Sequence, residues 1–135
     1  MRRAPAIVAA AILLAACAGN PEEKSVVSRN DAIDDYIEVA DLTEIDQIRI
    51  KRELHHKLIT EDYILVDDGK DTYLVAFLRR CRELNEINVT PDYRYDARIL
   101  DARYDTYRGC KIRSLYAITE GQAAELLDLG ARPDD

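Results

Sequence analysis

Three cysteines, Cys17, Cys81 and Cys110, are the residues of this sequence that can form covalent bonds most readily. A thiol can carry an acyl chain, join a second thiol as a disulfide, or bind a metal ion as the thiolate. Cys81 and Cys110 lie far apart, and neither has a second Cys or a His at the spacing typical of metal ligands. In an oxidising compartment this even pair predicts a disulfide, and a redox-active or metal-binding thiol pair is the alternative.

The residues before Cys17 decide which compartment is expected. Arg2 and Arg3 precede an apolar run over residues 6–16, which is too short to remain in a bilayer as a spanning helix. The run ends in Leu-Ala-Ala-Cys and is similar to the lipobox of bacterial lipoproteins, in which Cys17 is diacylated and becomes the new N-terminus. We therefore expect residues 1–16 to be a signal peptide and acyl chains such as palmitate on Cys17 to be the membrane partner.

The residue after the lipidation position refines the expected location. Ala18, rather than Asp, follows Cys17, which is similar to lipoproteins sorted onward to the outer membrane of proteobacteria. We therefore expect the mature chain on the periplasmic face of the outer membrane.

The charge balance argues against nucleic acid as a partner. The full chain has a formal net charge of −7, and removal of residues 1–16 takes away two arginines and no acid, which leaves −9. A chain this acidic repels phosphate backbones and anionic lipid surfaces. We expect no nucleic-acid partner.

Histidines and acidic clusters are the remaining candidates for catalysis or metal binding. His55 and His56 are adjacent, so in an extended segment they point to opposite sides and make a poor joint metal site. Either imidazole could act as a general base in a small periplasmic hydrolase or ligand-sensing protein, but the chain has no G-x-S-x-G nucleophile motif. Solvated or edge-strand histidines are the default, and we predict no catalytic residue, no metal site and no cofactor.

Three acidic clusters have the residue type that calcium prefers: Asp31 with Asp34 and Asp35, Asp67 with Asp68 and Asp71, and Asp134 with Asp135. None has the spacing of a calcium loop, and the Asp-Asp-Gly-Lys-Asp stretch at 67–71 is typical of a plain turn.

Tyrosine and arginine side chains suggest a surface for a partner. The chain has eight tyrosines, one Phe and no Trp, and several tyrosines in its second half lie close to arginines. Tyr and Arg are enriched in the hot spots of protein interfaces and can stack on sugars. The possible surface for an envelope protein or glycan comprises Tyr93, Tyr95, Arg103, Tyr104 and Tyr107. Cross-strand pairing on a half-exposed sheet is the alternative role of these residues.

The elements that must position these residues form one domain. Residues 17–29 contain Gly and Pro and predict a lipidated flexible linker, and residues 30–132 predict a single α+β domain. Its predicted fold is a small antiparallel sheet of about five strands built from two hairpins, with a short N-terminal helix and a C-terminal helix.

Periodicity predicts the individual elements in chain order. The predictions are a helix at 31–40, a strand at 44–52, hairpin strands at 63–67 and 72–78, one helical turn at 82–86, a loop at 89–92, a second hairpin from 101–107 to 110–118, and a helix that is capped by Thr119 with Gln122 and ends at Gly130. Strict alternation would place Cys110, Ile112, Ser114, Tyr116 and Ile118 on one face of the last strand.

Several short motifs are similar to a family of small proteobacterial envelope lipoproteins and secreted proteins that are classified as a domain of unknown function. The motifs are DAIDDYIEV at 31–39, YLV at 73–75, CREL at 81–84, ARYD at 102–105, RGCKI at 108–112 and YAI at 116–118. The resemblance spans roughly residues 30–130 and implies an envelope protein with a small sheet and paired Cys81 and Cys110. It implies no activity, substrate or catalytic residue.

Overall fold

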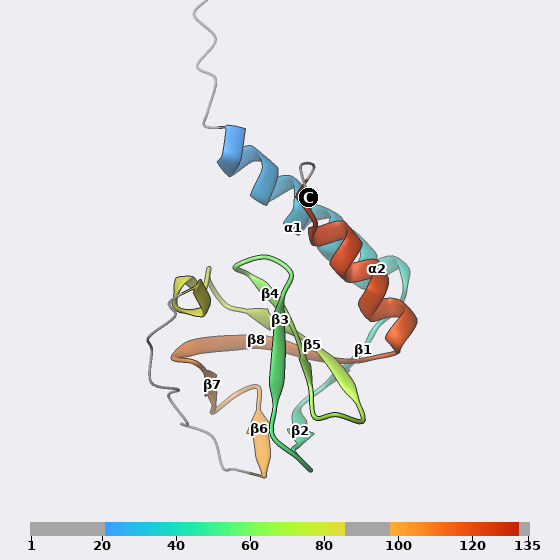
Figure 1. Ribbon diagram of the computed structural model, residues 1–135, viewed down its shortest axis with the longest axis vertical. Coiled ribbons are helices and arrows are strands. Elements are labelled where there is room, and N and C mark those ends of the chain that lie inside the picture. Colours follow the sequence, from blue (N-terminus) through green and yellow to red (C-terminus); the bar gives the residue numbers. More distant parts are fainter. Residues whose placement is uncertain (1–20, 86–97, 133–135) are drawn as a thin grey trace, which may run out of the picture.

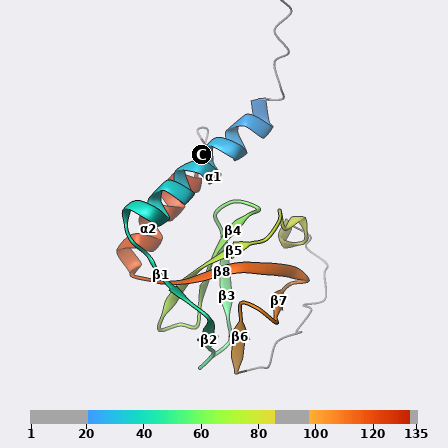
Figure 2. The same ribbon diagram turned by 180° about the vertical axis from the view of Figure 1, so that it is seen from behind.

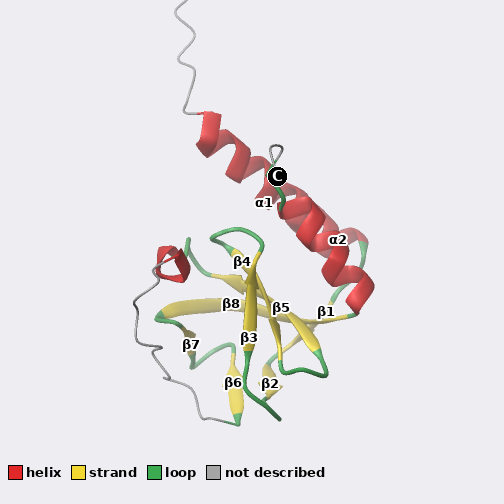
Figure 3. Ribbon diagram, in the orientation of Figure 1, coloured by secondary structure: helices red, strands yellow, loops and turns green. Residues whose placement is uncertain are grey.

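The computed structural model of the protein describes residues 21–85 and 98–132 and confirms the α+β class (Figures 1 and 3). Two helices accompany an antiparallel six-stranded sheet and a separate two-stranded sheet. In chain order the elements are α1 (Pro21–Val39), β1 (Thr43–Ile45), β2 (Gln47–Arg49), β3 (His55–Leu58), β4 (Tyr63–Asp67), β5 (Thr72–Phe77), the 3-10 turn η1 (Arg82–Asn85), β6 (Ile99–Asp101), β7 (Thr106–Tyr107), β8 (Cys110–Ile118) and α2 (Glu120–Gly130).

The main sheet has the strand order β1-β8-β5-β4-β3, with β7 paired to β8 and every pairing antiparallel. The β4–β5 hairpin is confirmed, and its turn is built as Asp-rich turns usually are. One Asp68 carboxylate oxygen accepts the backbone N–H groups of Lys70 and Asp71, and Gly69 has a φ of 81°.

Apolar side chains cover both faces of the main sheet and form two cores. In one core, Ile33 of α1 and Leu126 of α2 pack with Leu74 of β5, and all three are fully buried. In the other core, Ile48 of β2 and Leu100 of β6 are buried with Val75 and further sheet residues. Figures 1 and 2 show the two helices side by side at one end of the domain and β2 with β6 at the other.

The first helix begins earlier than the sequence predicts. It starts at Pro21 rather than at Asp31, so it includes most of the segment for which a flexible linker is predicted. Proline is well accepted in the first turn of a helix because its missing N–H has no intrahelical partner there. No further Pro or Gly interrupts the sequence up to Val39, and the side chains of Arg29 and Asn30 bond to the rest of the domain.

The strand predicted at 44–52 is two strands in different sheets. β1 pairs with β8, whereas β2 pairs with β6. The chain bends at Asp46, whose carbonyl accepts the N–H of Ala102. The break has a sequence cause, because Ile45 and Ile48 are three positions apart and one regular strand could not turn both to the same face.

The second predicted hairpin is also shorter than expected. Of residues 101–107, only Thr106 and Tyr107 pair with β8. The turn between them and β8 contains Arg108 and Gly109, which both have positive φ, as a type I′ turn requires. Asp101 lies instead at the end of β6, in the two-stranded sheet.

Because of a bulge in β8, the residues predicted to share one face of this strand are divided between its two faces. Ala76 pairs with Ser114, but the next residue, Phe77, pairs with Ile112, so Arg113 is the extra residue. Its insertion reverses the alternation, and Leu115 therefore shares a core with Cys110 and Ile112. Tyr116 and Ile118 pack in the core beside the helices.

The C-terminal helix confirms its predicted cap. The Thr119 hydroxyl accepts the N–H of Gln122 at 3.2 Å, and the Gln122 side chain accepts the N–H of Thr119 at 2.9 Å. These reciprocal bonds satisfy two donors that would otherwise be unpaired at a helix start. The helix ends at Gly130, as predicted.

Candidate functional site

The predicted partner surface is only partly present on the outside of the domain. Arg103 and Tyr104 are exposed, and Tyr104 is 83% exposed. Tyr107 is only 4% exposed and belongs to a core, so its inclusion in a partner surface is wrong. Short strand β7 turns this side chain inward beside Cys110. Tyr93 and Tyr95 lie outside the described residues.

A groove passes beside the two exposed residues. Its walls are the β1–β2 segment and the turn after β6, and its volume is about 570 Å³. We call it the β1–β6 groove; the residues that line it are Glu44, Ile45, Asp46, Gln47, Asp101, Arg103 and Tyr104. Arg103 and Tyr104 were predictable from the sequence, but the opposite wall was not, because it exists only where the chain bends between β1 and β2.

Backbone hydrogen bonds hold the turn that carries Arg103 and Tyr104. The Asp101 carboxylate accepts the N–H of Arg103 at 2.8 Å and that of Tyr104 at 3.3 Å. Asp105 in turn accepts the N–H of Asp101 at 2.7 Å. These bonds fix the backbone of the turn and present both side chains to solvent.

The groove carries a negative formal charge. Three carboxylates and one guanidinium line it, which gives a formal charge of −2. Asp46 and Arg103 form an ion pair at 3.8 Å, but their side chains are 84% and 72% exposed. An ion pair this exposed contributes little to stability, so its members are available to exchange it for contacts with a partner.

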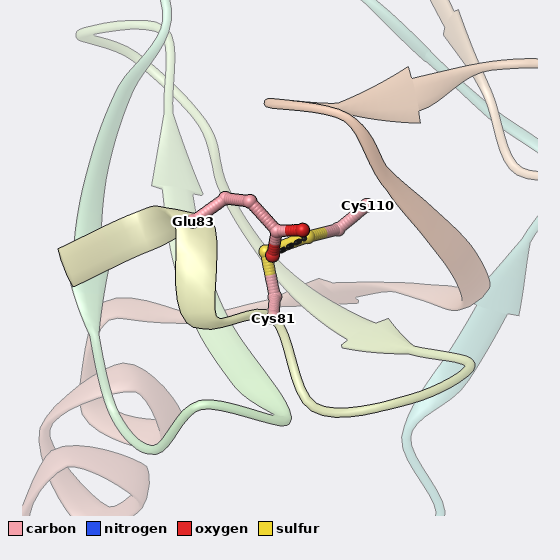
Figure 4. The surroundings of a disulfide bond; sticks show 3 residues. All are labelled: Cys81, Glu83 and Cys110. Atoms are coloured by element: carbon pink, nitrogen blue, oxygen red, sulfur yellow. Dashed lines mark hydrogen bonds between the residues drawn. A yellow bond between two sulfur atoms is a disulfide. The ribbon is translucent and has the colours of Figure 1, made fainter. Parts of the chain in front are cut away.

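The disulfide between Cys81 and Cys110 is confirmed, with a Cα–Cα distance of 5.7 Å. Both cysteines are buried, and Oε2 of Glu83 lies 3.2 Å from Sγ of Cys110 (Figure 4). The three side chains bring their S and O atoms within 4.8 Å of one another, a grouping that can hold a metal ion. A disulfide sulfur is not a thiolate, however, so the closed bond lacks the ligands that a metal would need.

The two histidines lie on the edge strand β3 and have different surroundings. His55 is exposed, whereas His56 is partly buried and its Nδ1 lies 3.0 Å from the hydroxyl of Tyr107. Burial, followed by the nearby Arg108 guanidinium, lowers the pKa of His56 below its ordinary value. Among the described residues, the group that hydrogen-bonds the His56 ring is thus the hydroxyl of Tyr107 and not a carboxylate.

A polar network that sequence reasoning did not identify joins α1 to the sheet. The Tyr63 hydroxyl donates to Asp34 and accepts from Arg113 at 2.8 Å, while Arg113 pairs with Asp34 at 3.6 Å. Burial, followed by the hydrogen bond to Asp34, raises the pKa of Tyr63. Asp34 thus has a structural role that its place in an acidic cluster did not indicate.

Further polar contacts continue along α1. The Asn30 amide donates to Asp62 at 2.6 Å and accepts from the buried Thr60 hydroxyl at 2.7 Å. The Tyr36 hydroxyl donates to Glu125 of α2 at 2.5 Å. This hydrogen bond, followed by burial and the charge of Glu125, raises the pKa of Tyr36 to about 12. These bonds fasten the C-terminal half of α1 to the domain.

Comparison with protein-family models, curated proteins and solved structures gave no match. Within the described residues, neither helix combines the length and the apolar character needed to cross a membrane.

Proposed function

We propose that the protein is a lipid-anchored envelope protein whose β1–β6 groove binds another envelope component without catalysing a reaction. The observation that carries this proposal is the position of the groove. β2 and β6, which adjoin it, lie at the end of the domain opposite the N-terminal end of α1 (Figures 1 and 2). A chain anchored ahead of α1 therefore presents the groove away from its anchor.

The disulfide bond supports the proposal that the protein is exported to an oxidising compartment. Buried disulfides persist in the periplasm and are rare in a reducing cytosol. The Cys81–Cys110 bond fits the destination predicted from residues 1–16 and from Cys17. Acyl chains on Cys17, at the periplasmic face of the outer membrane, are the anchor in this proposal, and the resemblance to small envelope lipoproteins agrees with it.

Contacts between α1 and the rest of the domain connect the domain to the proposed anchor. Ile33 is fully buried, and the Arg29 side chain donates to the carbonyl of Gly130 at 2.6 Å. Because α1 is fixed to the domain and begins at Pro21, close in sequence to Cys17, the proposed anchor holds the domain through this helix. The groove then lies on the side of the domain away from the start of α1 (Figures 1 and 2).

A hydrolase or ligand sensor that uses His55 or His56 is the alternative function. It requires a carboxylate or nucleophile near an imidazole. The contact of His56 with Tyr107 and the nearby Arg108 do not favour this chemistry, and we assign both histidines to the structure of the β3 edge.

A Cys17→Ala variant tests the anchor. Without the acylated thiol, we expect the protein to move from the membrane pellet to the soluble fraction, while circular dichroism and the Cys81–Cys110 disulfide stay unchanged. Retention of the folded variant in a salt-washed pellet would contradict the proposal.

Photo-crosslinking in intact cells tests the groove. A photoreactive residue in place of Tyr104 should form a discrete crosslinked product, and the same residue in place of Asp35 on α1 should not. Equal products at both positions, or none at position 104, would reject the groove as the binding site.

A further inference from the structure

We propose that the β1–β6 groove binds a cationic, extended polypeptide segment that lies alongside β1. This inference rests on the proposed function and specifies the chemistry of the partner. Its three supports are the charge of the groove, the edge of β1 that no described strand covers, and the exposed ring of Tyr104.

The charge of the groove selects a cation. Glu44 and Asp46 are exposed on one wall, and Asp101 lies on the other. Arg103 is the single cation in the lining and balances one of the three carboxylates. The whole chain is acidic as well, with a formal net charge of −7, so it repels anionic glycans and phosphate groups before they reach the groove. Lysine and arginine side chains are the complementary groups.

The edge of the main sheet selects an extended backbone. β1 has β8 on one side, and within residues 21–85 and 98–132 no strand pairs with its other side. An edge strand offers unpaired N–H and C=O groups, to which an extended peptide can add as a further strand. Thr43, Glu44 and Ile45 form this edge, and Glu44 and Ile45 also line the groove.

Side chains along the groove match an added strand. Glu44 lies in β1 and Asp46 lies in the bend that follows it, and both line the groove. Cationic side chains of an extended peptide beside β1 can therefore approach both carboxylates. Tyr104 lies on the opposite wall, and its exposed ring can stack with an arginine guanidinium. One binding mode therefore uses the backbone edge, the carboxylates and the aromatic ring together.

Fluorescence anisotropy tests this binding mode. The probe is a fluorescein-labelled Lys-Val-Arg-Val-Lys peptide, and the protein is the full acylated chain in non-ionic detergent micelles. We expect saturable binding that weakens at least about fivefold between 50 and 300 mM salt, because exposed charge pairs are screened by ions. A peptide with Glu in place of each cation should not bind.

Two matched double variants separate the groove from general charge. Glu44→Gln with Asp46→Asn removes two carboxylates from the groove, whereas Asp35→Asn with Glu38→Gln removes two exposed carboxylates from α1. We expect the first pair to weaken binding at least about tenfold and the second less than about twofold. Tyr104→Ala should weaken binding more than Tyr104→Phe. Circular dichroism checks that each variant is folded.

Three outcomes would overturn the inference: equal weakening by both double variants, equal binding of the cationic and acidic peptides, or binding of a neutral or anionic glycan fragment that displaces the cationic peptide. The crosslinking experiment at position 104 distinguishes this failure from failure of the proposed function. A discrete crosslink in cells without peptide binding rejects only the cationic partner, whereas the absence of both rejects the groove as a binding site.

Discussion

At the scale of single residues, contacts from elements distant in the sequence determine the surroundings of the His56 and Tyr63 side chains. His56 is on an edge strand, yet Tyr107 from β7 contacts its ring, with the ring centroids 5.6 Å apart in an edge-on arrangement. Tyr63 begins a buried strand and is tied to α1 through Asp34. Neither contact was predictable from the sequence, because each joins residues about 30 to 50 positions apart.

The environment of His56 predicts a pH dependence of stability. Its folded pKa lies below the ordinary value of 6.5, so the unfolded chain binds more protons as the pH falls through 6.5. The contribution of His56 to the free energy of unfolding is therefore present above the unfolded pKa and declines as the pH falls toward the folded pKa. A His56→Gln variant should lose less stability than the wild type between about pH 7 and about pH 5.

Denaturant unfolding at several pH values measures this difference, and NMR of the imidazole protons gives the pKa directly. We expect a midpoint for His56 below 6.5. A midpoint at or above 6.5 would show that the ring is not desolvated as the structure indicates.

At the scale of elements, local signals predicted the β4–β5 hairpin and α2 well. The Asp-Gly turn and the Thr119–Gln122 capping box are completed within a few residues, so their sequence patterns contain nearly all the necessary information. The separation of β1 from β2 and the bulge at Arg113 depend on which distant strand each segment meets. One wall of the β1–β6 groove is formed at that separation, which is why the candidate site was only half predicted.

Close packing at the end of α2 predicts that a larger residue at Gly130 destabilises the domain. A Cβ atom at Gly130 would lie 2.2 Å from Cγ2 of Ile59 and 2.9 Å from its carbonyl oxygen. Gly130→Ala should therefore lower the free energy of unfolding by about 1–3 kcal/mol, as overpacking of a core usually does.

Gly121→Ala is the matched control at the other end of α2, where the nearest atom to an added Cβ is 3.8 Å away. It should leave stability unchanged or raise it by about 0.5–1 kcal/mol, because alanine favours a helix. Urea denaturation of both variants measures the difference. Equal effects would show that Gly130 is not required by close packing against Ile59.

At the scale of the whole molecule, α+β architecture and the disulfide followed from the sequence, but the layered arrangement did not. The apolar residues of β4 and β5 indicate burial without showing that each face of the sheet has its own core. Two small cores leave a narrow margin of stability, so one covalent link is important for the fold. The link joins the residue before η1 to the first residue of β8.

Removal of that link should destabilise the entire domain. The disulfide separates its cysteines by 29 positions, and closing a loop of this size is worth about 3.5 kcal/mol in the chain-entropy model. We expect Cys81→Ala with Cys110→Ala to lower the free energy of unfolding by about that amount in urea. Cys17→Ala, which leaves the disulfide intact, is the control, and equal stability of the two variants would contradict a structural role for the bond.

The central strands β4, β5 and β8 contribute residues to both cores, and the bulge at Arg113 decides which residues of β8 belong to each core. Leu115 supports the layer that contains β2 and β6, and its neighbour Tyr116 supports the layer that contains the helices. Detachment of β8 would expose both cores at once, which couples the stability of one layer to that of the other. We therefore expect the domain to unfold in a single cooperative step rather than layer by layer.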